Sequence, residues 1–294
     1  MIDVYAARNA TVVGNRITGN VASGIAFGGS VNTTIAKNHV IGSPETDNGI
    51  IVDSSSRTKI VNNVVRSNEF GIDVIESTNT TIAGNDSIGN VADGFAVIDS
   101  PGTKILSNVA RRNDTVGIFL GDTQRANAKV VGNDLSGSDY GIFVGGAHRG
   151  SFVANEAHNN CAGMVFDADF GGSVGNFEVK GNTVKDNTLS CAAPPPAISG
   201  IGIGLFGARG MEVTGNHLSG NVPSGPSASS PSLVSGGVVV GVSPFGGTTK
   251  PMNNSVIGNH FGRNKPDIFW DKSGSGNRFV GNLCDTSVPS SLCN

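Results

Sequence analysis

An internal repeat limits what this chain can fold into more than any other feature of its sequence. An apolar residue, two further residues and Asn recur eleven times, from Val-Val-Gly-Asn15 to Phe-Val-Gly-Asn282. Successive Asn residues are separated by 23, 25, 22, 23, 25, 22, 27, 34, 43 and 23 residues. Periods in this range are typical of solenoids, because one repeat is too small to bury its own apolar face and must stack on its neighbours.

Each repeat contains three short β runs separated by turns. A second Asn follows the first by five residues in eight repeats, at Asn20, Asn68, Asn90, Asn113, Asn160, Asn187, Asn221 and Asn264, and Ser138 takes that place once. Asn suits such bends because it tolerates left-handed backbone and its amide pairs with the Asn of the next coil. The pattern predicts an all-β fold, a right-handed parallel β-helix of about 11 coils that forms one domain over residues 1–294.

Composition agrees with a solenoid and excludes several other classes. The 294 residues include 43 Gly and 31 Asn, and only 15% are charged, which argues against coiled coils and helical bundles. The net charge of −3 offers no basic excess, so nucleic acid is not an expected partner. No run of about 18 apolar residues is present, so no transmembrane segment is expected.

The four cysteines indicate an oxidising compartment. Cys161, Cys191, Cys284 and Cys293 are separated by 30, 93 and 9 residues, and none of these spacings matches a zinc-binding CxxC pattern. Two disulfides are the better interpretation, and they predict a secreted or extracellular protein. Because the chain opens without a signal peptide, we expect a mature form or a piece of a longer precursor.

The repeat resembles a known family. Its Gly-Ile or Gly-Phe strand, Ile-x-x-Asn turn and later Asn are similar to the right-handed parallel β-helix repeat proteins of the pectate-lyase-like superfold. That group includes NosD-type periplasmic proteins, polysaccharide lyases, uronate epimerases and polygalacturonases. The closing segment 265–294 resembles the tail of secreted actinobacterial members. We expect a bridge between Cys284 and Cys293 within it. The resemblance implies the scaffold and leaves the activity open.

The beginning of the chain departs from this family. Such proteins usually start with a capping helix, whereas Ile2-Asp3-Val4 already has the pattern of a coil's last strand. An uncovered first coil would expose sheet edges that promote aggregation. We therefore expect that N-terminal coils or a cap are missing, or that a partner covers this end.

Functional residues are expected where the period is interrupted, since loops add what stacked coils lack. Insertions over residues 188–201 and 222–236 fall at the same corner of successive coils, and a Cys161–Cys191 bridge would tie the first one to the stack. A third excess, which contains Asp167, lies at the opposite end of its strand. Together they predict a groove over the strands of the later coils. A decorated surface without a ligand is the alternative.

The outward position of these strands is expected two residues after each Gly, because side chains alternate along a strand. Its members are Ala26, Ile51, Asp73, Ala96, Phe119, Phe143, Val165, Gly204 and Val239. Phe119 and Phe143 would lie on successive coils, about 4.8 Å apart. With Tyr140 beside them, they could stack on sugar rings, unless a loop covers them.

An acidic residue ends many of the same strands. The predicted column consists of Asp53, Glu76, Asp99, Asp122 and Asp167. Stacked carboxylates repel one another unless cations or hydrogen bonds offset the repulsion. Ser or Thr often follows the acid, which favours turns closed by side-chain hydrogen bonds to the backbone. A Ca²⁺ or sugar site at Asp53, Glu76, Asp99 and Asp122 is the alternative.

A second acidic set precedes the strands. It consists of Asp47, Glu69, Asp93 and Asp139, with Tyr140 next to the last. Two carboxylates on one face could hydrolyse a glycosidic bond. The Asn-Thr-Asp, Asp-Asp and Gly-His-Gly signatures of polygalacturonases are absent, however, which lowers the expectation of a hydrolase.

The segment Asp139-Tyr140-Gly-Ile resembles the start of the uronate-epimerase motif Tyr-Gly-Phe/Ile-Asp-Pro-His, although five residues separate that Ile from His148. The resemblance implies Tyr140 and His148 as proton-transfer groups, with a nearby Arg neutralising the uronate carboxylate. The predicted catalytic residues are Tyr140, His148, Arg149 and Asp139. The predicted substrate-binding residues are Phe119, Phe143, Arg125 and Asp167. The remaining His residues share no partner, so no metal site is predicted.

Three functions follow from these patterns. The first is a secreted carbohydrate-active protein that acts on an acidic polysaccharide by lyase or uronate-epimerase chemistry. The second is a non-catalytic carbohydrate-binding or structural β-helix, and the third is a glycoside hydrolase. Trials with a panel of polyuronides would separate them, because a lyase releases unsaturated products, an epimerase exchanges a proton and a binding protein does neither.

Overall fold

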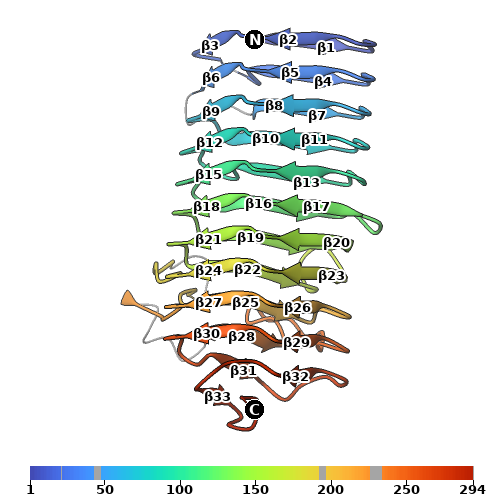
Figure 1. Cartoon of the computed structure of the whole chain (residues 1–294). Coiled ribbons are helices and arrows are strands. Elements are labelled where there is room, and N and C mark those ends of the chain that lie inside the picture. Colours follow the sequence, from blue (N-terminus) through green and yellow to red (C-terminus); the bar gives the residue numbers. More distant parts are fainter. Residues whose placement is uncertain (21, 43–47, 192–196, 226–233, 294) are drawn as a thin grey trace.

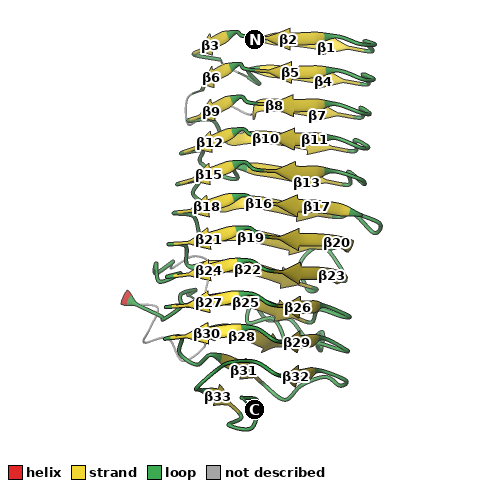
Figure 2. Ribbon diagram, in the orientation of Figure 1, coloured by secondary structure: helices red, strands yellow, loops and turns green. Residues whose placement is uncertain are grey.

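The chain winds into a rod of stacked coils. The structure is a computed structural model that describes residues 1–20, 22–42, 48–191, 197–225 and 234–293. Within these residues every coil contributes strands that pair in parallel with their counterparts in the neighbouring coils (Figure 1). Figure 2 shows strands and loops, and the described helical structure is a single 3₁₀ residue, Gly225. The predicted all-β solenoid is therefore confirmed.

Three parallel sheets form the sides of the rod. In the described residues sheet I has 12 strands, sheet II has 11 and sheet III has 10. The strands of sheet I are β1 (Ile2–Tyr5), β4 (Ile25–Gly28), β7 (Asn48–Asp53), β10 (Phe70–Ile75), β13 (Phe95–Ile98), β16 (Val116–Gly121), β19 (Tyr140–Gly145), β22 (Ala162–Asp167), β25 (Ile201–Phe206), β28 (Gly236–Gly241), β31 (Ile268–Trp270) and β33 (Ser287–Val288).

The other two sheets have shorter strands. Those of sheet II are β2 (Thr11–Val13), β5 (Thr34–Ala36), β8 (Lys59–Val61), β11 (Thr81–Ala83), β14 (Lys104–Leu106), β17 (Ala128–Val131), β20 (His148–Val153), β23 (Gly175–Lys180), β26 (Glu212–Thr214), β29 (Ser255–Ile257) and β32 (Arg278–Val280). Those of sheet III are β3 (Arg16–Thr18), β6 (His39–Ile41), β9 (Val64–Arg66), β12 (Asp86–Ile88), β15 (Val109–Arg111), β18 (Asp134–Ser136), β21 (Glu156–His158), β24 (Thr183–Lys185), β27 (His217–Ser219) and β30 (His260–Gly262).

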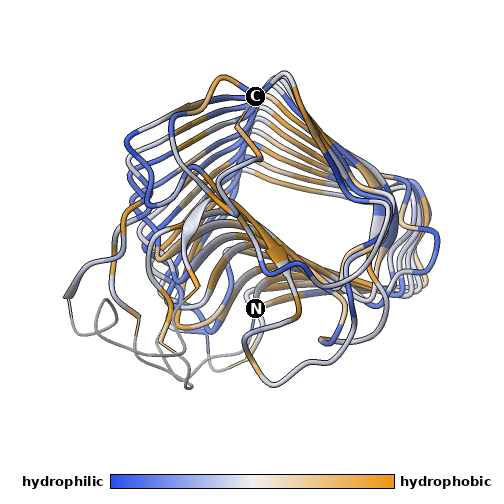
Figure 3. Ribbon diagram, turned by 90° about the horizontal axis from the view of Figure 1, so that it is seen from below, coloured by the Kyte–Doolittle hydropathy of each residue, from blue (hydrophilic) through white to orange (hydrophobic). Residues whose placement is uncertain are grey.

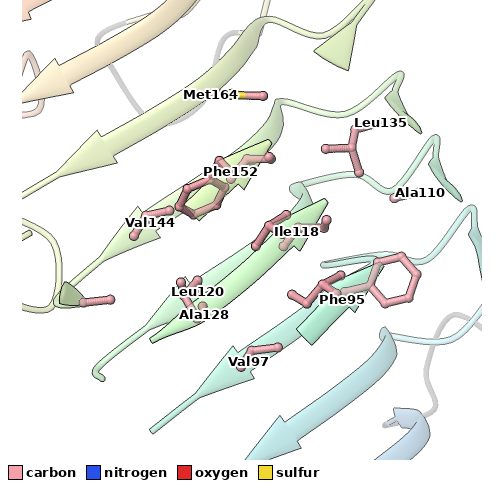
Figure 4. Packing of buried hydrophobic residues seen from close by; sticks show 14 of the residues in the cluster. Phe95, Val97, Ala110, Ile118, Leu120, Ala128, Leu135, Val144, Phe152 and Met164 are labelled. Carbon is pink, nitrogen blue, oxygen red and sulfur yellow. The ribbon is translucent and has the colours of Figure 1, made fainter. Parts of the chain in front are cut away.

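The core occupies the interior of the rod, which Figure 3 views along its axis. Because side chains alternate along a strand, residues such as Ile118 and Leu120 of β16 point inward and are fully buried. They stack on equivalent residues of the coils before and after them, for example Val97 and Val144 (Figure 4). No helix in the described part of the chain is long and apolar enough to cross a membrane.

Asparagine ladders hold the bends between sheets II and III. Each Asn from Asn15 to Asn259 donates a hydrogen bond from Nδ2 to Oδ1 of the repeat Asn in the next coil, over 2.8–3.1 Å. The backbone N–H of the same Asn donates to that oxygen as well, for example from Asn85 to Asn108 over 2.9 Å. The prediction that these Asn line one bend is confirmed.

Both disulfides are present. Cys161 and Cys191 are bridged with their Cα atoms 6.0 Å apart, and Cys284 and Cys293 with theirs 5.4 Å apart. The bridge at Cys191 joins the base of the first long insertion to the stack, where Cys191 also pairs with Ile198 through two backbone hydrogen bonds. The centres of the insertions, residues 192–196 and 226–233, lie outside the described residues.

Candidate functional site

The outward column of sheet I has the register that the sequence predicts. Asp73 of β10 lies beside Ala96 of β13, which lies beside Phe119 of β16. Phe119 in turn lies beside Phe143 of β19, and Phe143 beside Val165 of β22. The outer face of this sheet therefore carries a carboxyl group and two aromatic rings in one line.

A cavity of about 570 Å³ opens on this face, and we refer to it as the sheet I cavity. Its aromatic lining consists of Phe70, Phe119, Tyr140, Phe143, Phe170 and Phe245, and its carboxyl groups are those of Asp73, Asp93, Asp167 and Asp169. No Lys, Arg or His lines it among the described residues. The volume lies in the ~300–1,000 Å³ range of small-molecule sites.

The aromatic rings form one connected group. The rings of Phe119 and Phe143 are stacked with centroids 6.2 Å apart, and Tyr140 meets Phe143 edge-on at 5.0 Å. Phe170, from the loop after β22, meets Phe143 edge-on at 5.1 Å and Phe119 at 6.1 Å. Part of the aromatic surface is thus covered by a loop, as the alternative prediction held, and the rest faces the cavity.

Asp73 is an unusual residue for the middle of a sheet. Its side chain is only 6% exposed, and its Oδ1 atom has no hydrogen-bond partner. Burial raises the pKa of Asp73 to about 6; a backbone hydrogen bond from Val74 opposes this shift, and the charge of Asp53 adds to it. A carboxyl group left unsatisfied in this way costs stability, which is typical of a functional position.

Asp93 lies in the turn before β13 and is 9% exposed. Burial raises the pKa of Asp93 to about 7; a backbone hydrogen bond from Val116 lowers the pKa, and the charge of Asp73 raises it. The charge of Asp73 therefore acts on Asp93. Near neutral pH Asp93 is the more protonated of the two groups and Asp73 the more ionised.

Two loops form the wall of the cavity at the end of the strands. Ser243 donates a hydrogen bond from Oγ to Oδ2 of Asp167 over 2.6 Å, and Thr249 donates one from Oγ1 to Oδ1 of Asp169 over 2.6 Å. The backbone N–H of Asp169 also donates to Asp167. Burial raises the pKa of Asp167, and the Ser243 hydrogen bond opposes that shift.

Tyr140 and Asp139 lie at the other end of the same strands. Burial, with the charges of Asp139 and Asp167, raises the pKa of Tyr140 above its usual value, so the phenol holds its proton. Asp139 does not line the cavity; burial and the charge of Asp114 raise the pKa of Asp139 to about 6. Its carboxylate lies within 4.8 Å of the sulfur atoms of Cys161 and Cys191. Those sulfurs form a disulfide and supply no thiolate for a metal ion.

The predicted catalytic and substrate-binding residues other than Asp139 divide between two sites. Tyr140, with the predicted binding residues Phe119, Phe143 and Asp167, borders the sheet I cavity. His148, Arg149 and Arg125 line a separate pocket of about 330 Å³ on sheet II, together with Gln124, Ser173 and Asn176. The structure does not bring Tyr140 and His148 into one site, because the strand that carries Tyr140 ends at the corner before β20 begins.

The predicted acidic column is wrong in register. Asp53 lies beside Ile75 rather than Glu76, and Gly145 lies beside Asp167. Glu76, Asp99 and Asp122 occupy the next position, where the backbone is left-handed. Asp53 and Asp167 lie four residues after the Gly of their strand and the other three acids lie five residues after theirs, so the acids occupy two neighbouring positions rather than one column. All except Asp167 are exposed, and among the described residues no three of these acids bring their carboxylate oxygens within 4.8 Å of one another.

The turn chemistry predicted at this corner is confirmed. The hydroxyls of Ser55, Ser77, Ser100 and Thr123 each donate a hydrogen bond of 2.8 Å to the carbonyl two residues earlier. Their oxygens also accept backbone N–H groups from the preceding coil, as from Ser77 to Ser100. The carboxylates next to them are therefore not needed to close the turns. Asp47, from the second acidic set, lies outside the described residues.

The sequence-based site omitted several residues of the cavity. Asp73 belongs to the outward column and Asp93 to the second acidic set, and Asp73 is the charged member of an otherwise uncharged position, which is a usable signal. None of the predicted columns or insertions contains Ser243 or Phe245. The distance from Gly237 to Asn259 is 22 residues, where 14 is usual, and this excess indicates a loop after β28.

The described coils, the three parallel sheets and the cavity on one outer face define a parallel β-helix protein with a ligand-sized site. A sequence model described as the right-handed beta helix region matches residues 1–155 and 123–261. The chain belongs to this family. No curated protein matches the chain.

Solved structures with the same fold include three that bear on carbohydrates. The A-module of the mannuronan C-5 epimerase AlgE4 of Azotobacter vinelandii is 16% identical, with a TM-score of 0.59 over 94% of this chain and 76% of that one. DFA-IIIase from Arthrobacter chlorophenolicus A6, in complex with GF2, is 13% identical, with a TM-score of 0.60 over 90% and 66%. A tailspike protein mutant of E. coli bacteriophage HK620, in complex with a pentasaccharide, is 15% identical, with a TM-score of 0.59 over 95% and 58%. At these identities the likeness concerns the fold.

Proposed function

We propose that this protein is a carbohydrate-active β-helix that cleaves or transfers a glycosidic bond in the sheet I cavity. Asp93 is the proton donor and Asp73 the partner carboxylate. The observation that carries the proposal is a pair of buried carboxyl groups in one aromatic cavity, Asp93 with its pKa raised to about 7, in part by the charge of Asp73, and Asp73 with its pKa raised to about 6. Two carboxyl groups of different pKa are what glycoside chemistry requires.

The lining of the cavity suits a sugar. The half-buried Phe119 offers aromatic surface that can pack against the C–H face of a pyranose or furanose ring, and the buried Phe143 supports it from the next coil. Asp167 and Asp169, already held by Ser243 and Thr249, have acceptor oxygens for sugar hydroxyls. A solved structure with the same fold that holds a pentasaccharide agrees with this class of ligand.

The proposed step balances in protons and charge. The Asp93 carboxyl gives its proton to the glycosidic oxygen as the bond from that oxygen to the anomeric carbon breaks, and the leaving sugar departs as an alcohol. The ionised Asp73 takes the proton of the water or sugar hydroxyl whose oxygen bonds to the anomeric carbon, and the pair is restored when Asp73 gives that proton to solvent and the ionised Asp93 takes one up. If Asp73 instead bonds to the anomeric carbon, the ionised Asp93 takes a proton from the water or hydroxyl whose oxygen then displaces Asp73.

Uronate chemistry has less support in the same cavity. A lyase or epimerase needs a base beside the uronate and a group that neutralises its carboxylate. The cavity has no cationic lining residue in the described chain, and its four carboxyl groups would repel a uronate. Tyr140, with its raised pKa, is a poor base at neutral pH. The two disulfides favour a location outside the cytosol for either activity.

The proposal is tested with the intact protein and a panel of neutral glycans, mixed glycans and polyuronides. We expect new anomeric proton signals by NMR from a glycan with an uncharged sugar at the cleavage point, without the absorbance of unsaturated uronates. Unsaturated products or proton exchange at C5 would overturn the proposal in favour of a lyase or epimerase. Binding without any product would replace it by a binding function.

A further inference from the structure

A second pocket, which we call the basic pocket, lies on the outer face of sheet II. Its volume is about 330 Å³, and its lining consists of Gln124, Arg125, His148, Arg149, Ser173 and Asn176. Arg149 of β20 and Asn176 of β23 lie on successive coils, since the residues before and after them are paired in register. Arg125 comes from the loop between β16 and β17. Three consecutive coils therefore contribute to it.

The charge of the basic pocket is uncompensated. No acidic residue lines it, and neither Arg125 nor Arg149 forms an ion pair within the described part of the chain. The carboxylate of Asp122, at the same corner, lies against the Gly146 and Gly171 positions instead. Two guanidinium groups facing one pocket without a carboxylate repel each other, unless an anion binds between them.

The neutral groups of the pocket are suited to a polar ligand. His148 forms a hydrogen bond between Nε2 and the hydroxyl of Ser173, over 2.9 Å. Burial and the charge of Arg149 lower the pKa of His148, so its ring is neutral and presents a hydrogen bond rather than a third charge. Gln124 and Asn176 supply amide donors and acceptors. The described residues of the lining include no apolar side chain against which an apolar ligand could pack.

We propose that the basic pocket binds an oxyanion, a carboxylate or a sulfate, carried by a sugar unit of the same glycan that the sheet I cavity acts on. Guanidinium groups bind both anions through paired N–H donors. That the anion belongs to a sugar rests on the proposed function. The presence of the anion site rests only on Arg125, Arg149 and their surroundings.

One loop connects the two sites. The segment between β22 and β23 places Asp169 and Phe170 in the wall of the sheet I cavity and Ser173 in the lining of the basic pocket. A glycan that crosses this loop would have an uncharged unit among the aromatic rings and an acidic unit at the arginines. The acidic sheet I cavity would reject the charged unit, which fixes the direction of the chain.

The test is an NMR titration of the Nε–H signals of arginine in the intact protein with three probes: trigalacturonate, a sulfated disaccharide and neutral maltotriose. We expect one of the two anionic probes to shift the Arg125 and Arg149 signals with a dissociation constant in about the millimolar range or tighter. We expect maltotriose to leave those signals unchanged. The probe that shifts them identifies a carboxylate or a sulfate as the natural group.

The variant Arg125→Gln/Arg149→Gln is expected to raise the dissociation constant of the responding probe by about tenfold or more. The matched control is Lys104→Gln/Lys129→Gln, which removes the same charge from adjacent outward positions of β14 and β17. An equal loss in the control would show attraction to net charge alone and overturn the proposal. No shift with either anion up to about 10 mM would overturn it as well.

The two proposals fail separately. Because anion binding is read at Arg125 and Arg149 themselves, it does not depend on turnover. If Asp93→Asn left turnover unchanged while the arginine signals still shifted, only the proposed chemistry would fall. If turnover depended on Asp93 and no anion bound, only the proposed anion site in the basic pocket would be overturned.

Discussion

The hydroxyl of Ser243 donates a hydrogen bond of 2.6 Å to Asp167, a residue 76 positions earlier in the chain. A second contact, from Thr249 to Asp169, joins the same two loops. The wall of the sheet I cavity is therefore built from two segments that hold each other in place over β25. Its shape depends on tertiary hydrogen bonds rather than on the stacked coils alone.

Replacing Asp93 by Asn should stabilise the protein at alkaline pH. The pKa of Asp93 in the folded chain is about 7 against 3.8 for the free group, so the folded state binds more protons between these values and loses stability as pH rises through them. We expect Asp93→Asn to raise the free energy of unfolding on the order of 2–4 kcal/mol at pH ~8 and to change it little at pH ~4. Thermal unfolding at both pH values measures this, with the exposed Asp99→Asn as the control. A lower free energy of unfolding for Asp93→Asn at pH ~8 would contradict the claim that the ionised Asp93 destabilises the folded state.

The rate of turnover should pass through a maximum between pH ~6 and ~7. The ascending limb reflects ionisation of Asp73, whose pKa is about 6, and the descending limb reflects loss of the Asp93 proton near 7. Because the charge of Asp53 contributes to the raised pKa of Asp73, Asp53→Asn should move the ascending limb to lower pH. The profile of kcat/KM against pH is the measurement. A profile that is flat between pH ~5 and ~8 would exclude this pair as the titrating groups.

The ring of Phe119, the more exposed of the stacked pair, should contribute to binding rather than to chemistry. Phe119→Leu keeps an apolar side chain and removes the ring, and we expect the dissociation constant of a bound glycan to rise about fivefold to tenfold, with kcat little changed. Phe152→Leu alters a fully buried ring of the core. This control should lower the melting temperature without weakening the binding of the glycan. Calorimetric titration separates the two, and equal affinities in all three proteins would contradict the sugar-stacking role.

The asparagine ladder should dominate the stability of the bends. Asn108 donates to Asn133 and to the carbonyl of Ile82, and accepts from Asn85. Asn108→Ala leaves these buried groups without partners, so we expect a loss of about 3 kcal/mol or more. Lys104→Ala, on the exposed face of the same coil, should cost less than about 0.5 kcal/mol. Chemical unfolding of both variants tests the difference.

The repeat could be predicted from sequence because it depends on residues that each turn of the backbone requires locally. Asn15, Asn38 and their successors recur at the coil period and are needed wherever the backbone turns, so their pattern predicts the stack, the bends and the outward column. The disulfide between Cys161 and Cys191 could be predicted in the same way, since both cysteines fall at one corner of successive coils.

The site was harder to predict because it depends on burial and on contacts between distant loops. His148 follows Tyr140 by eight residues, yet the two face different pockets because a corner lies between β19 and β20. The raised pKa values of Asp73 and Asp93 come from the loops and rings around them, which no local pattern records. The predicted column at Asp53 and Glu76 was out of register by one residue because Asp53 is the last residue of its strand, whereas Glu76 is the first residue of the turn after its strand.

The most direct test of the central claim is turnover by Asp73→Asn and Asp93→Asn on the glycan that the protein cleaves. Anomeric proton NMR gives the rate, and calorimetric titration gives the affinity. We expect each substitution to lower kcat by about 10²–10⁴-fold, because a proton-transfer group is lost, while the dissociation constant changes by less than about threefold. Turnover by either variant within about threefold of the unaltered protein would contradict the assignment of Asp73 and Asp93.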